Sequence, residues 1–238
     1  MDNDIRINKY ISMSGYCSRR AADALVEESR VYVDGVIATA GTKVKAGQRV
    51  LIDGVEIRPV EDKKIYAFYK PVGYISSLSD EQGEGIGKFI PNGMRLFPVG
   101  RLDKESEGLM LLTNDGELMN SILNAANGHE KEYIVTTRQE ITEDFLDKMS
   151  KGVPITNAAT GKKVVTAPCK TKRISERKFK ITIIQGLNRQ IRRMCGYFGY
   201  HVEELVRVRI MNISVKGMKP GQIIELTSDK VNELRKLL

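Results

Sequence analysis

Apolar residues recur every three to four positions between residues 7 and 14, and again between residues 21 and 26. This spacing predicts two short helices near the start of the chain. Gly15 is placed to end the first helix, because glycine accepts the backbone conformation that follows a helix C-terminus. Ser18 can cap the second helix by accepting a hydrogen bond from a free backbone N–H group.

Two hairpins and a linker are predicted next. The segments 31–38 (VYVDGVIA) and 50–57 (VLIDGVEI) each place Asp-Gly between apolar runs, a strong signal for a tight turn. The stretch 59–64 is polar and starts with proline, which favours a linker. We therefore expect a small domain over residues 1–58, a linker over 59–64 and a larger domain over 65–238.

The larger domain has a strand-rich pattern with inserted helices. Strands are predicted over residues 65–69, 109–113, 132–137, 179–184 and 223–226, and helices over 116–124, 142–151, 190–198 and 228–238. Strands mixed irregularly with helices are typical of an α+β domain on a mainly antiparallel sheet.

Composition adds a preference for an anionic partner. The 238 residues carry a formal net charge of +8, which attracts polyanions such as nucleic acid. Cys17, Cys169 and Cys195 lie far apart without a CxxC pair, so neither a zinc site nor a disulfide framework is indicated. With no signal-peptide pattern, no apolar run of about 18 residues and no heptad repeat, we expect a cytoplasmic monomer without membrane contact.

The predicted N-terminal helices carry clustered basic residues interleaved with Tyr10 and Tyr16. The cluster consists of Arg6, Lys9, Arg19 and Arg20. Such side chains suit phosphate oxygens, although an ordinary solvated helix face is the alternative. The run from residue 5 to residue 55, with S-G-x-C-S-R-R followed by V-x-V-D-G, resembles the alpha-L (S-four-like) RNA-binding motif. This resemblance implies a module that holds structured RNA and does no chemistry.

The segment 97–113 (FPVGRLDKESEGLMLLT) places one carboxylate between two cations. Asp103 stands in a polar turn between Arg101 and Lys104, ahead of an apolar run. A strand would hold the carboxylate at the rim of a sheet, and the cations would keep it ionised. A charged aspartate needs no separate base to act as a nucleophile. A surface salt bridge is the alternative, which spacing alone favours.

Two further segments strengthen the prediction of a site. Tyr133 lies in a strand pattern, where a tyrosine at a pocket floor can stack on a base, although a half-buried strand tyrosine explains it equally well. Residues 185–195 (QGLNRQIRRMC) lead into a helix whose first turns hold Arg189, Arg192 and Arg193. These cations repel one another and oppose the positive helix N-terminus, so they indicate an anionic partner, either RNA phosphate or an internal carboxylate.

Together these segments resemble the RsuA/RluF family of ribosomal RNA pseudouridine synthases, over essentially the whole chain. The resemblance is carried by KPVG at 70–73, GRLDKESEGLMLLTNDG at 100–116 and GLNRQIRRM at 186–194. NGHEKEYIVT at 127–136 and IQGLNRQIRRMC at 184–195 resemble in particular the F-type branch, whose members act on large-subunit RNA. Members of that branch carry a longer basic C-terminal tail.

The resemblance implies roles for individual residues. Asp103 is expected to be the nucleophile, Tyr133 the active-site tyrosine, and Arg192 the arginine that pairs with the aspartate. Ile191 falls where the family places an apolar residue against the target base. Further RNA contacts are expected from Lys70, Arg101, Lys104, Arg189, Gln190 and Arg193, with no metal ion and no cofactor.

The implied reaction is the isomerisation of uridine to pseudouridine. The bond from the sugar to N1 breaks, and a bond to carbon 5 of the same base forms, so no atom is lost and no redox cofactor is required. The base must first leave its stack, at a cost of roughly a few kcal/mol. Asp103 could attack the sugar or the base, or assist loss of a ribose proton. We expect 23S ribosomal RNA as substrate, with a tRNA or small-subunit RNA left open.

Two other classes of protein remain as alternatives. A non-catalytic RNA-binding or ribosome-assembly protein would show the same charge but would have no need for Asp103, Tyr133 and Arg192 together. A metal-dependent hydrolase would gather acidic residues around Mg²⁺, and Glu105 and Glu107 could imitate such a cluster.

Overall fold

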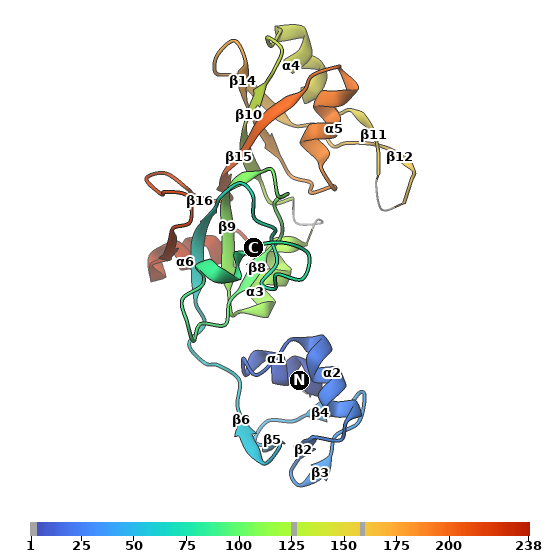
Figure 1. The fold of residues 1–238 in the computed structure, drawn as a ribbon, viewed down its shortest axis with the longest axis vertical. Coiled ribbons are helices and arrows are strands. Elements are labelled where there is room, and N and C mark those ends of the chain that lie inside the picture. Colours follow the sequence, from blue (N-terminus) through green and yellow to red (C-terminus); the bar gives the residue numbers. More distant parts are fainter. Residues whose placement is uncertain (1–3, 125–127, 158–159) are drawn as a thin grey trace. The chain divides into compact units, whose positions relative to one another are not determined.

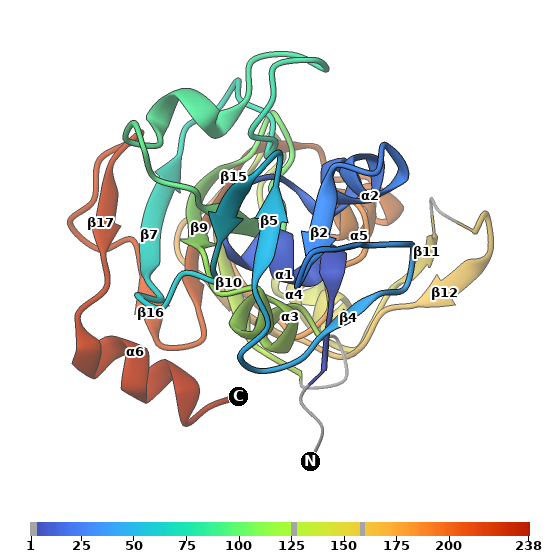
Figure 2. The same ribbon diagram turned by 90° about the horizontal axis from the view of Figure 1, so that it is seen from below.

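The computed structural model describes residues 4–124, 128–157 and 160–238 (Figures 1 and 2). The chain divides into two compact units. The first holds residues 4–64 together with Asn114–Gly116, and the second holds the remaining described residues. The segment 59–64, expected to be a linker, belongs to the first unit.

The first unit contains two helices and two small sheets. Its elements are β1 (Ile5–Arg6), α1 (Ile7–Met13), α2 (Arg19–Glu27), β2 (Val31–Val33), β3 (Val36–Ile37), β4 (Lys43–Val44), β5 (Val50–Ile52) and β6 (Val55–Ile57). The strands β3, β2, β5 and β6 form one sheet in that order, and β1 pairs with β4. Residues of α1, α2 and the strands enclose one apolar core, which includes Ile11, Ala22 and Ile52.

The local signals read from the sequence are confirmed in this unit. The Ser18 hydroxyl accepts a hydrogen bond from the backbone N–H of Ala21 at 3.2 Å, which caps α2. Both Asp-Gly pairs adopt positive φ, with 49° at Asp34 and 82° at Gly35. Two successive residues with positive φ are the requirement of the tight hairpin turn that the sequence predicts.

The second unit is built on one large sheet. Its elements are β7 (Ile65–Lys70), the short 3-10 helix η1 (Ile86–Phe89), β8 (Phe97–Val99), β9 (Glu107–Thr113), α3 (Gly116–Leu123), β10 (Lys131–Thr137), α4 (Glu143–Ser150), β11 (Pro154–Thr156), β12 (Lys163–Val165), β13 (Lys170–Arg173), β14 (Lys178–Ile183), α5 (Gln190–Tyr197), β15 (Val202–Ile210), β16 (Ile213–Ser214), β17 (Ile223–Glu225) and α6 (Ser228–Arg235). The sheet order is β13-β14-β10-β15-β9-β7-β17, and β8 and β16 extend it beside β9 and β15. The predicted α+β class with a mainly antiparallel sheet is confirmed.

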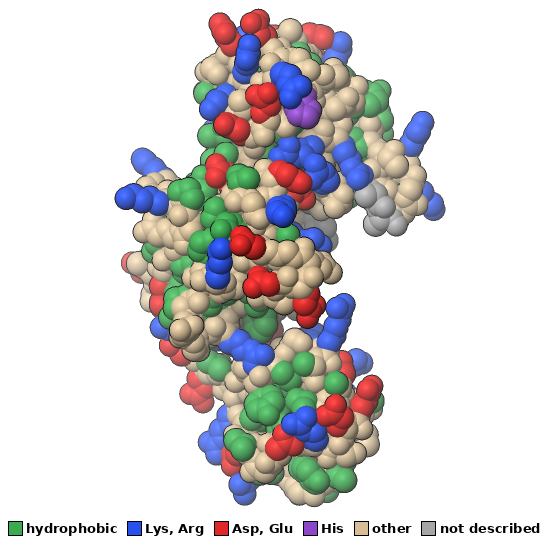
Figure 3. Space-filling model, viewed as in Figure 1, with side chains coloured by type: hydrophobic (Ala, Val, Ile, Leu, Met, Phe, Trp, Pro, Cys, Tyr) green, Lys and Arg blue, Asp and Glu red, His purple; other side chains and the backbone are tan. Residues whose placement is uncertain are grey.

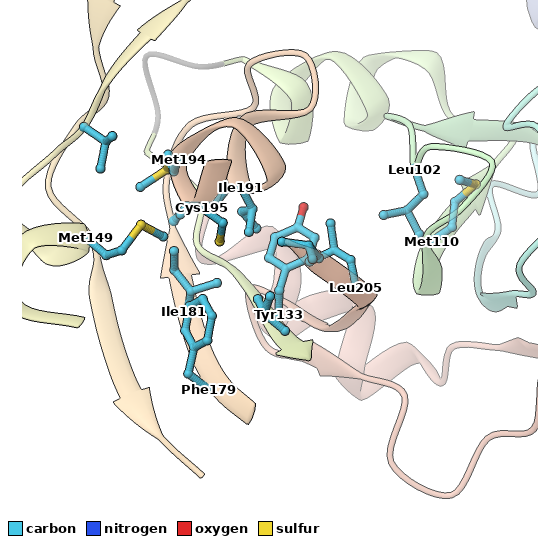
Figure 4. Close-up of a cluster of buried hydrophobic side chains, with 14 of the residues drawn as sticks. Leu102, Met110, Tyr133, Met149, Phe179, Ile181, Ile191, Met194, Cys195 and Leu205 are labelled. Atoms are coloured by element: carbon cyan, nitrogen blue, oxygen red, sulfur yellow. The ribbon is translucent and has the colours of Figure 1, made fainter. Parts of the chain in front are cut away.

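Strands β7 and β9 are neighbours in the sheet and are buried on both faces. Leu109, Leu111 and their neighbours on β7 pack with α3 and α6 in one apolar cluster. Met110 and Leu112 face the other way, into a cluster that also includes residues of α4 and α5 (Figure 4). Alternate residues of a strand point to opposite faces, so a continuous apolar run is what such a strand requires.

The sequence pattern did not predict β15, although this strand lies between β10 and β9. Four of its nine residues are charged: Glu203, Glu204, Arg207 and Arg209. Strand prediction relies on alternating apolar and polar residues, and the adjacent pair Glu203 and Glu204 interrupts this alternation at the start of β15. The strand β13 (KTKR) was missed because it is polar throughout, and β11 and β12 were missed because three residues each are too few to show a pattern.

The pair formed by β9 and β15 is parallel, and every other strand pair in the described part of the chain is antiparallel. Its register joins Val206 to Glu107 and Arg207 to Gly108. The two backbones approach closely at Gly108, where a Cβ atom would lie 2.2 Å from the carbonyl oxygen of Arg207. Gly108 also has a φ of 107°, which a residue with a side chain rarely adopts.

Substituting Gly108 therefore tests this junction. Gly108→Ala is expected to lower the free energy of unfolding by about 3 kcal/mol or more, because a disfavoured backbone conformation is combined with a backbone clash. Gly116→Ala is the matched control, because a Cβ atom there meets no neighbour within 4 Å. Urea unfolding measures both variants, and equal stability of the two would contradict this account of the junction.

Candidate active site

The turn that carries Asp103 connects β8 to β9, and six consecutive carbonyl groups along it accept hydrogen bonds. Arg101 O accepts from Arg207 Nη1 (3.3 Å), Leu102 O from Ser76 Oγ (2.7 Å), Asp103 O from Ser106 N (3.0 Å), Lys104 O from Gly73 N (2.8 Å), Glu105 O from Arg192 Nη2 (3.2 Å) and Ser106 O from Lys70 Nζ (2.8 Å). Three of these donors are cationic side chains. Several elements of the protein therefore hold the backbone around Asp103 in place.

Lys70, the last residue of β7, supplies one of these donors from a fully buried position, with 0% of its surface exposed. Its ammonium group donates to the carbonyls of Pro71 at 2.9 Å and Ser106 at 2.8 Å. Burial lowers the pKa of Lys70 to about 8, although the nearby carboxylates of Asp103 and Glu107 oppose this shift. In this structure Lys70 supports the Asp103 turn and has no surface to offer to RNA, unlike the contact expected from the sequence.

Arg189 makes the ion pair with Asp103. Its Nη1 atom lies 3.7 Å from Asp103 Oδ2 and 2.9 Å from Glu105 Oε2, so one nitrogen is shared between two carboxylates. The hydrogen bond and charge of Arg189 lower the pKa of Glu105. Arg189 precedes α5 with a φ of 49°, a conformation that costs a residue with a side chain about 1 kcal/mol or more.

Arg192 lies one turn further along α5 and is half-buried. It donates to the carbonyl of Val202 at 2.9 Å and to that of Glu105 at 3.2 Å. The sequence led us to expect that Arg192 pairs directly with Asp103, whereas these hydrogen bonds hold the backbone two residues beyond Asp103. Burial and the charge of Arg189 lower the pKa of Arg192, and the charges of Glu105 and Asp103 partly offset this effect.

A cavity of about 440 Å³ opens beside the Asp103 carboxylate. Its lining comes from the Asp103 turn, α3, β10, the loop before α5 and β15, and includes Asp103, Tyr133, Ile191 and Leu205. This volume lies within the range of small-ligand pockets, roughly 300–1,000 Å³. On the face shown in Figure 3, Lys and Arg side chains gather over the region of α5 with acidic side chains beside them.

Tyr133 and Ile191 bring apolar surface to this cavity. Tyr133 is only 8% exposed, and its ring lies between Ile191 and Leu205 with the hydroxyl group pointing away from Phe179 and Ile181 (Figure 4). Ile191 is 3% exposed and packs in the same apolar cluster. A planar base could therefore lie against these side chains with a carboxylate at its edge.

Known proteins are similar to this chain in sequence and in fold. A family model described as RNA pseudouridylate synthase matches residues 64–197, and another described as S4 domain matches residues 5–55. Dual-specificity RNA pseudouridine synthase RluF of Escherichia coli (strain K12) is 48% identical over 239 residues, which cover 100% of this chain and 80% of that protein.

The chain belongs to the RNA pseudouridylate synthase family. Ribosomal large subunit pseudouridine synthase B of Bacillus subtilis (strain 168) is 34% identical over 98% of this chain and 96% of its own length. A crystal structure of a pseudouridylate synthase has a TM-score of 0.71, with 25% identity over 98% of this chain and 100% of that chain. The protein is an RNA pseudouridine synthase, an isomerase, and the predicted family is confirmed.

The RNA contacts expected near the Asp103 turn fall into two groups. Arg101, Lys104 and Arg189 have exposed side chains, and Arg101 and Arg189 line the cavity. Gln190 is 4% exposed, and its side chain accepts a hydrogen bond from the backbone N–H of Leu187 at 3.1 Å, which stabilises the turn before α5.

Other basic residues named from the sequence are not among the residues that line the cavity. Arg193 donates to the carbonyl of Thr156 and to the side chain of Asn188, so it ties α5 to the strand β11. In the first unit, Arg6 lies at the start of α1 and Lys9 within that helix, while Arg19 and Arg20 begin α2. Arg6, Arg19 and Arg20 are exposed.

The structure also brings in residues that the sequence did not single out. Lys131 and Arg207 line the cavity, and Ser76 holds Leu102 through both its backbone N–H and its carbonyl group. Arg207 is only 3% exposed. The sequence analysis did not identify Arg207 because it did not predict the strand that contains this residue. The alternation V-R-V-R at 206–209 is the signal that could have indicated a strand here.

The acids that could imitate a metal cluster face different partners. Glu105 is bonded to Arg189, and the carboxylate of Glu107 forms a hydrogen bond with Tyr69. No group of three His, Cys, Asp or Glu residues in the described part of the chain could hold a metal ion. Burial raises the pKa of the Cys195 thiol, on α5, to about 12, so this cysteine is a poor nucleophile at neutral pH. In the described ranges, no helix is long and apolar enough to cross a membrane.

The buried ammonium of Lys70 predicts a measurable dependence of stability on pH. Its pKa is about 8 in the folded protein against 10.5 for an ordinary lysine, so the unfolded chain binds more protons between these values. Stability from this group therefore rises with pH in that window, by on the order of 2 kcal/mol between pH 8 and pH 10. Urea unfolding of the wild type and of Lys70→Met should diverge accordingly, whereas parallel pH curves would contradict the assigned shift.

Proposed function

We propose that this enzyme isomerises a specific uridine in large-subunit ribosomal RNA, with the Asp103 carboxylate as the nucleophile. The observation that carries this proposal is the fixed turn around Asp103, which holds a partly exposed carboxylate at the edge of a cavity large enough for a base. A carboxylate held in position loses little freedom when it reacts, which favours attack on a bound substrate.

The apolar part of the cavity fits the second task, which is to hold the base after the sugar–N1 bond breaks. Tyr133 offers a ring for stacking and a hydroxyl group at its rim, and Ile191 and Leu205 cover the sides. Apolar walls also exclude water, which would otherwise trap the sugar before the base has rotated. We assign Tyr133 to stacking on the uracil and to a proton relay through its hydroxyl group.

We assign Arg192 to the positioning of the catalytic turn rather than to direct neutralisation of Asp103. Its hydrogen bond to the carbonyl of Glu105 supports this role, and Arg189 is the guanidinium that pairs with the carboxylate. Arg189 and Arg101 are exposed beside the cavity, where RNA phosphates could bind them. Phosphate binding by Arg189 would draw it from Asp103 and free the carboxylate for reaction.

The first unit supports recognition of structured RNA. It matches the S4 domain and carries exposed arginines at the start of both helices. Phosphate contacts of this kind position RNA without reading its sequence. Binding energy from such remote contacts offsets the cost of unstacking the target base.

The proposed RNA substrate follows from the names of two similar proteins. The two relatives named above carry the names of a dual-specificity RNA enzyme and of a large-subunit ribosomal enzyme. We therefore propose 23S ribosomal RNA as the main substrate and a tRNA as a second one. We further propose that the enzyme works in the cytoplasm, as a monomer and without a cofactor.

Asp103→Asn tests the nucleophile and the substrate together. It should reduce isomerisation by at least about 10³-fold, because an amide oxygen is a far weaker nucleophile than a carboxylate. RNA affinity should stay within about twofold, since the phosphate contacts are unchanged. Tritium release from RNA labelled at uridine carbon 5 measures turnover, with 23S, 16S and transfer RNA assayed separately.

Asp147→Asn is the matched control for this substitution. Asp147 lies on α4 and pairs with Lys151 at 2.6 Å on the surface, so its loss should leave turnover unchanged. Wild-type rates in Asp103→Asn would refute the assignment of the nucleophile. Release only from 16S RNA would refute the proposed substrate while keeping the chemistry.

A further inference from the structure

The cavity beside Asp103 carries more positive charge than its single carboxylate can balance. Among the described residues that line it, Arg101, Lys131, Arg189 and Arg207 are cationic and Asp103 is the one anion. Arg101 and Arg189 are exposed and available to RNA phosphates. Lys131 and Arg207 have no role in the proposal above, although both belong to the central strands of the sheet.

These two cations lie beside the tyrosine proposed to stack on the base. Lys131 is two residues before Tyr133 on β10, so both side chains point to the same face of the sheet. Arg207 is directly opposite Tyr133 in the pairing of β10 with β15. The uracil that stacks on Tyr133 would therefore have both positive charges near it.

Arg207 is held by two hydrogen bonds and has one nitrogen without a partner among the described residues. Its Nε atom donates to the carbonyl of Leu109 at 2.6 Å, and its Nη1 atom donates to the carbonyl of Arg101 at 3.3 Å. Its Nη2 atom is buried and has no hydrogen-bond partner among the described residues. A buried charged donor without a partner is costly, and such groups gather where a ligand or a reacting group completes them.

The ammonium group of Lys131 is also partly buried and lies near the positive charge of Arg207. Its ammonium group donates to the carbonyl of His129 at 3.1 Å. Burial, and secondly the positive charge of Arg207, lower the pKa of Lys131. Two cations that repel each other in a cavity are stabilised by an anion, and a neutral uridine base does not supply one.

The isomerisation itself generates an anion at this place. When the bond between C1′ and N1 breaks, both electrons stay on the base, and uracil separates as a monoanion with its charge spread over N1, O2 and O4. Meanwhile C1′ bonds to a carboxylate oxygen of Asp103, or C2′ gives its proton to that carboxylate. The base stays negative until carbon 5 bonds to C1′, as the bond from C1′ to Asp103 breaks or the Asp103 carboxyl group returns its proton to C2′. The proton on carbon 5 is then lost and N1 gains a proton.

We propose that Lys131 and Arg207 form a cationic wall that stabilises the uracil anion between cleavage and reattachment. This inference rests on the proposed function of Asp103. Lys131 is the more exposed of the two and contacts the base, whereas Arg207 acts through its fixed charge and by holding the backbone of Arg101. Charges that are in place before the reaction stabilise a transition state without reorganisation.

Lys131→Met tests the wall by removing the charge while keeping an unbranched side chain. The single-turnover rate at saturating RNA should fall about 10- to 100-fold, less than for loss of a complete oxyanion site because Arg207 remains. The dissociation constant for RNA should change by less than about twofold. Lys131→Arg, which keeps the charge, should recover most of the rate, and thermal unfolding verifies that both variants are folded.

Lys180→Met is the matched control on the same sheet. Lys180 lies on β14 opposite Ile134, so its side chain points to the other face, where it pairs with Glu132 at 3.5 Å. Its loss should leave the rate unchanged. A wild-type rate in Lys131→Met, or an equal loss in Lys180→Met, would overturn the proposal.

A substrate whose base leaves the sugar as a more stable anion gives a sharper test of the cationic wall. Fluorine at carbon 5 of the target uridine stabilises the uracil anion, so the reaction should depend less on Lys131. The rate compared is consumption of the target nucleoside, measured by digestion to nucleosides and chromatography, because fluorine cannot leave carbon 5 as a proton does and no pseudouridine forms from this RNA. The ratio of this rate in wild type to that in Lys131→Met should therefore shrink at least about threefold with 5-fluorouridine RNA. Equal ratios for both substrates would overturn the proposal, as would a loss of RNA affinity with an unchanged rate, which would identify a phosphate site instead.

Failure of the Asp103 site and failure of the cationic wall give different results. If the wild-type protein releases no tritium from any of the three RNAs, the proposed function of the Asp103 site fails. If the wild type is active and Lys131→Met matches it on both substrates, only the cationic wall is wrong.

Discussion

The site depends on hydrogen bonds to the backbone carbonyls of residues 101–106. Donors reach this turn from β7, α5, β15 and the loop after β7, so elements far apart in the sequence hold one carboxylate in place. The same contacts bring Lys70, Arg192 and Arg207 close to that carboxylate. The same side chains therefore fix the position of the Asp103 carboxylate and set the charge around it. The parallel pairing of β9 with β15 places Arg207 within reach of this turn.

The arrangement also explains why so much positive charge is buried around one acid. Each buried cation costs desolvation energy, and Lys70 and Lys131 both have lowered pKa values. Their hydrogen bonds to carbonyl groups offset part of this cost. Arg207, with a buried nitrogen that lacks a partner among the described residues, adds to this cost, and the negative charge proposed to develop on the base would offset it. Strain in the free protein is typical of sites built for a transition state.

Much of the fold could be predicted from the sequence, and the reasons for the misses are physical. Central strands such as β9 were predicted because the run from Leu109 to Leu112 is apolar without interruption. The strand β15 was missed because the adjacent pair Glu203 and Glu204 interrupts its apolar pattern, and Arg207, which lines the cavity, was missed with it. Asp103 and Tyr133 were found through their motifs, whereas the buried position of Lys70 and the shift of the ion pair from Arg192 to Arg189 depend on three-dimensional packing. Local pattern cannot report which carbonyl a long cationic side chain will reach.

Amide hydrogen exchange of the RNA-free protein, followed by NMR, tests most directly whether the Asp103 turn is fixed before substrate arrives. The N–H groups of Ser106 and Gly73 donate to the carbonyls of Asp103 and Lys104 at 3.0 Å and 2.8 Å. A preorganised turn predicts that both amides exchange about as slowly as those of β9. Exchange at the rate of an unstructured loop would contradict the account, because the carboxylate would then have to be positioned by the RNA.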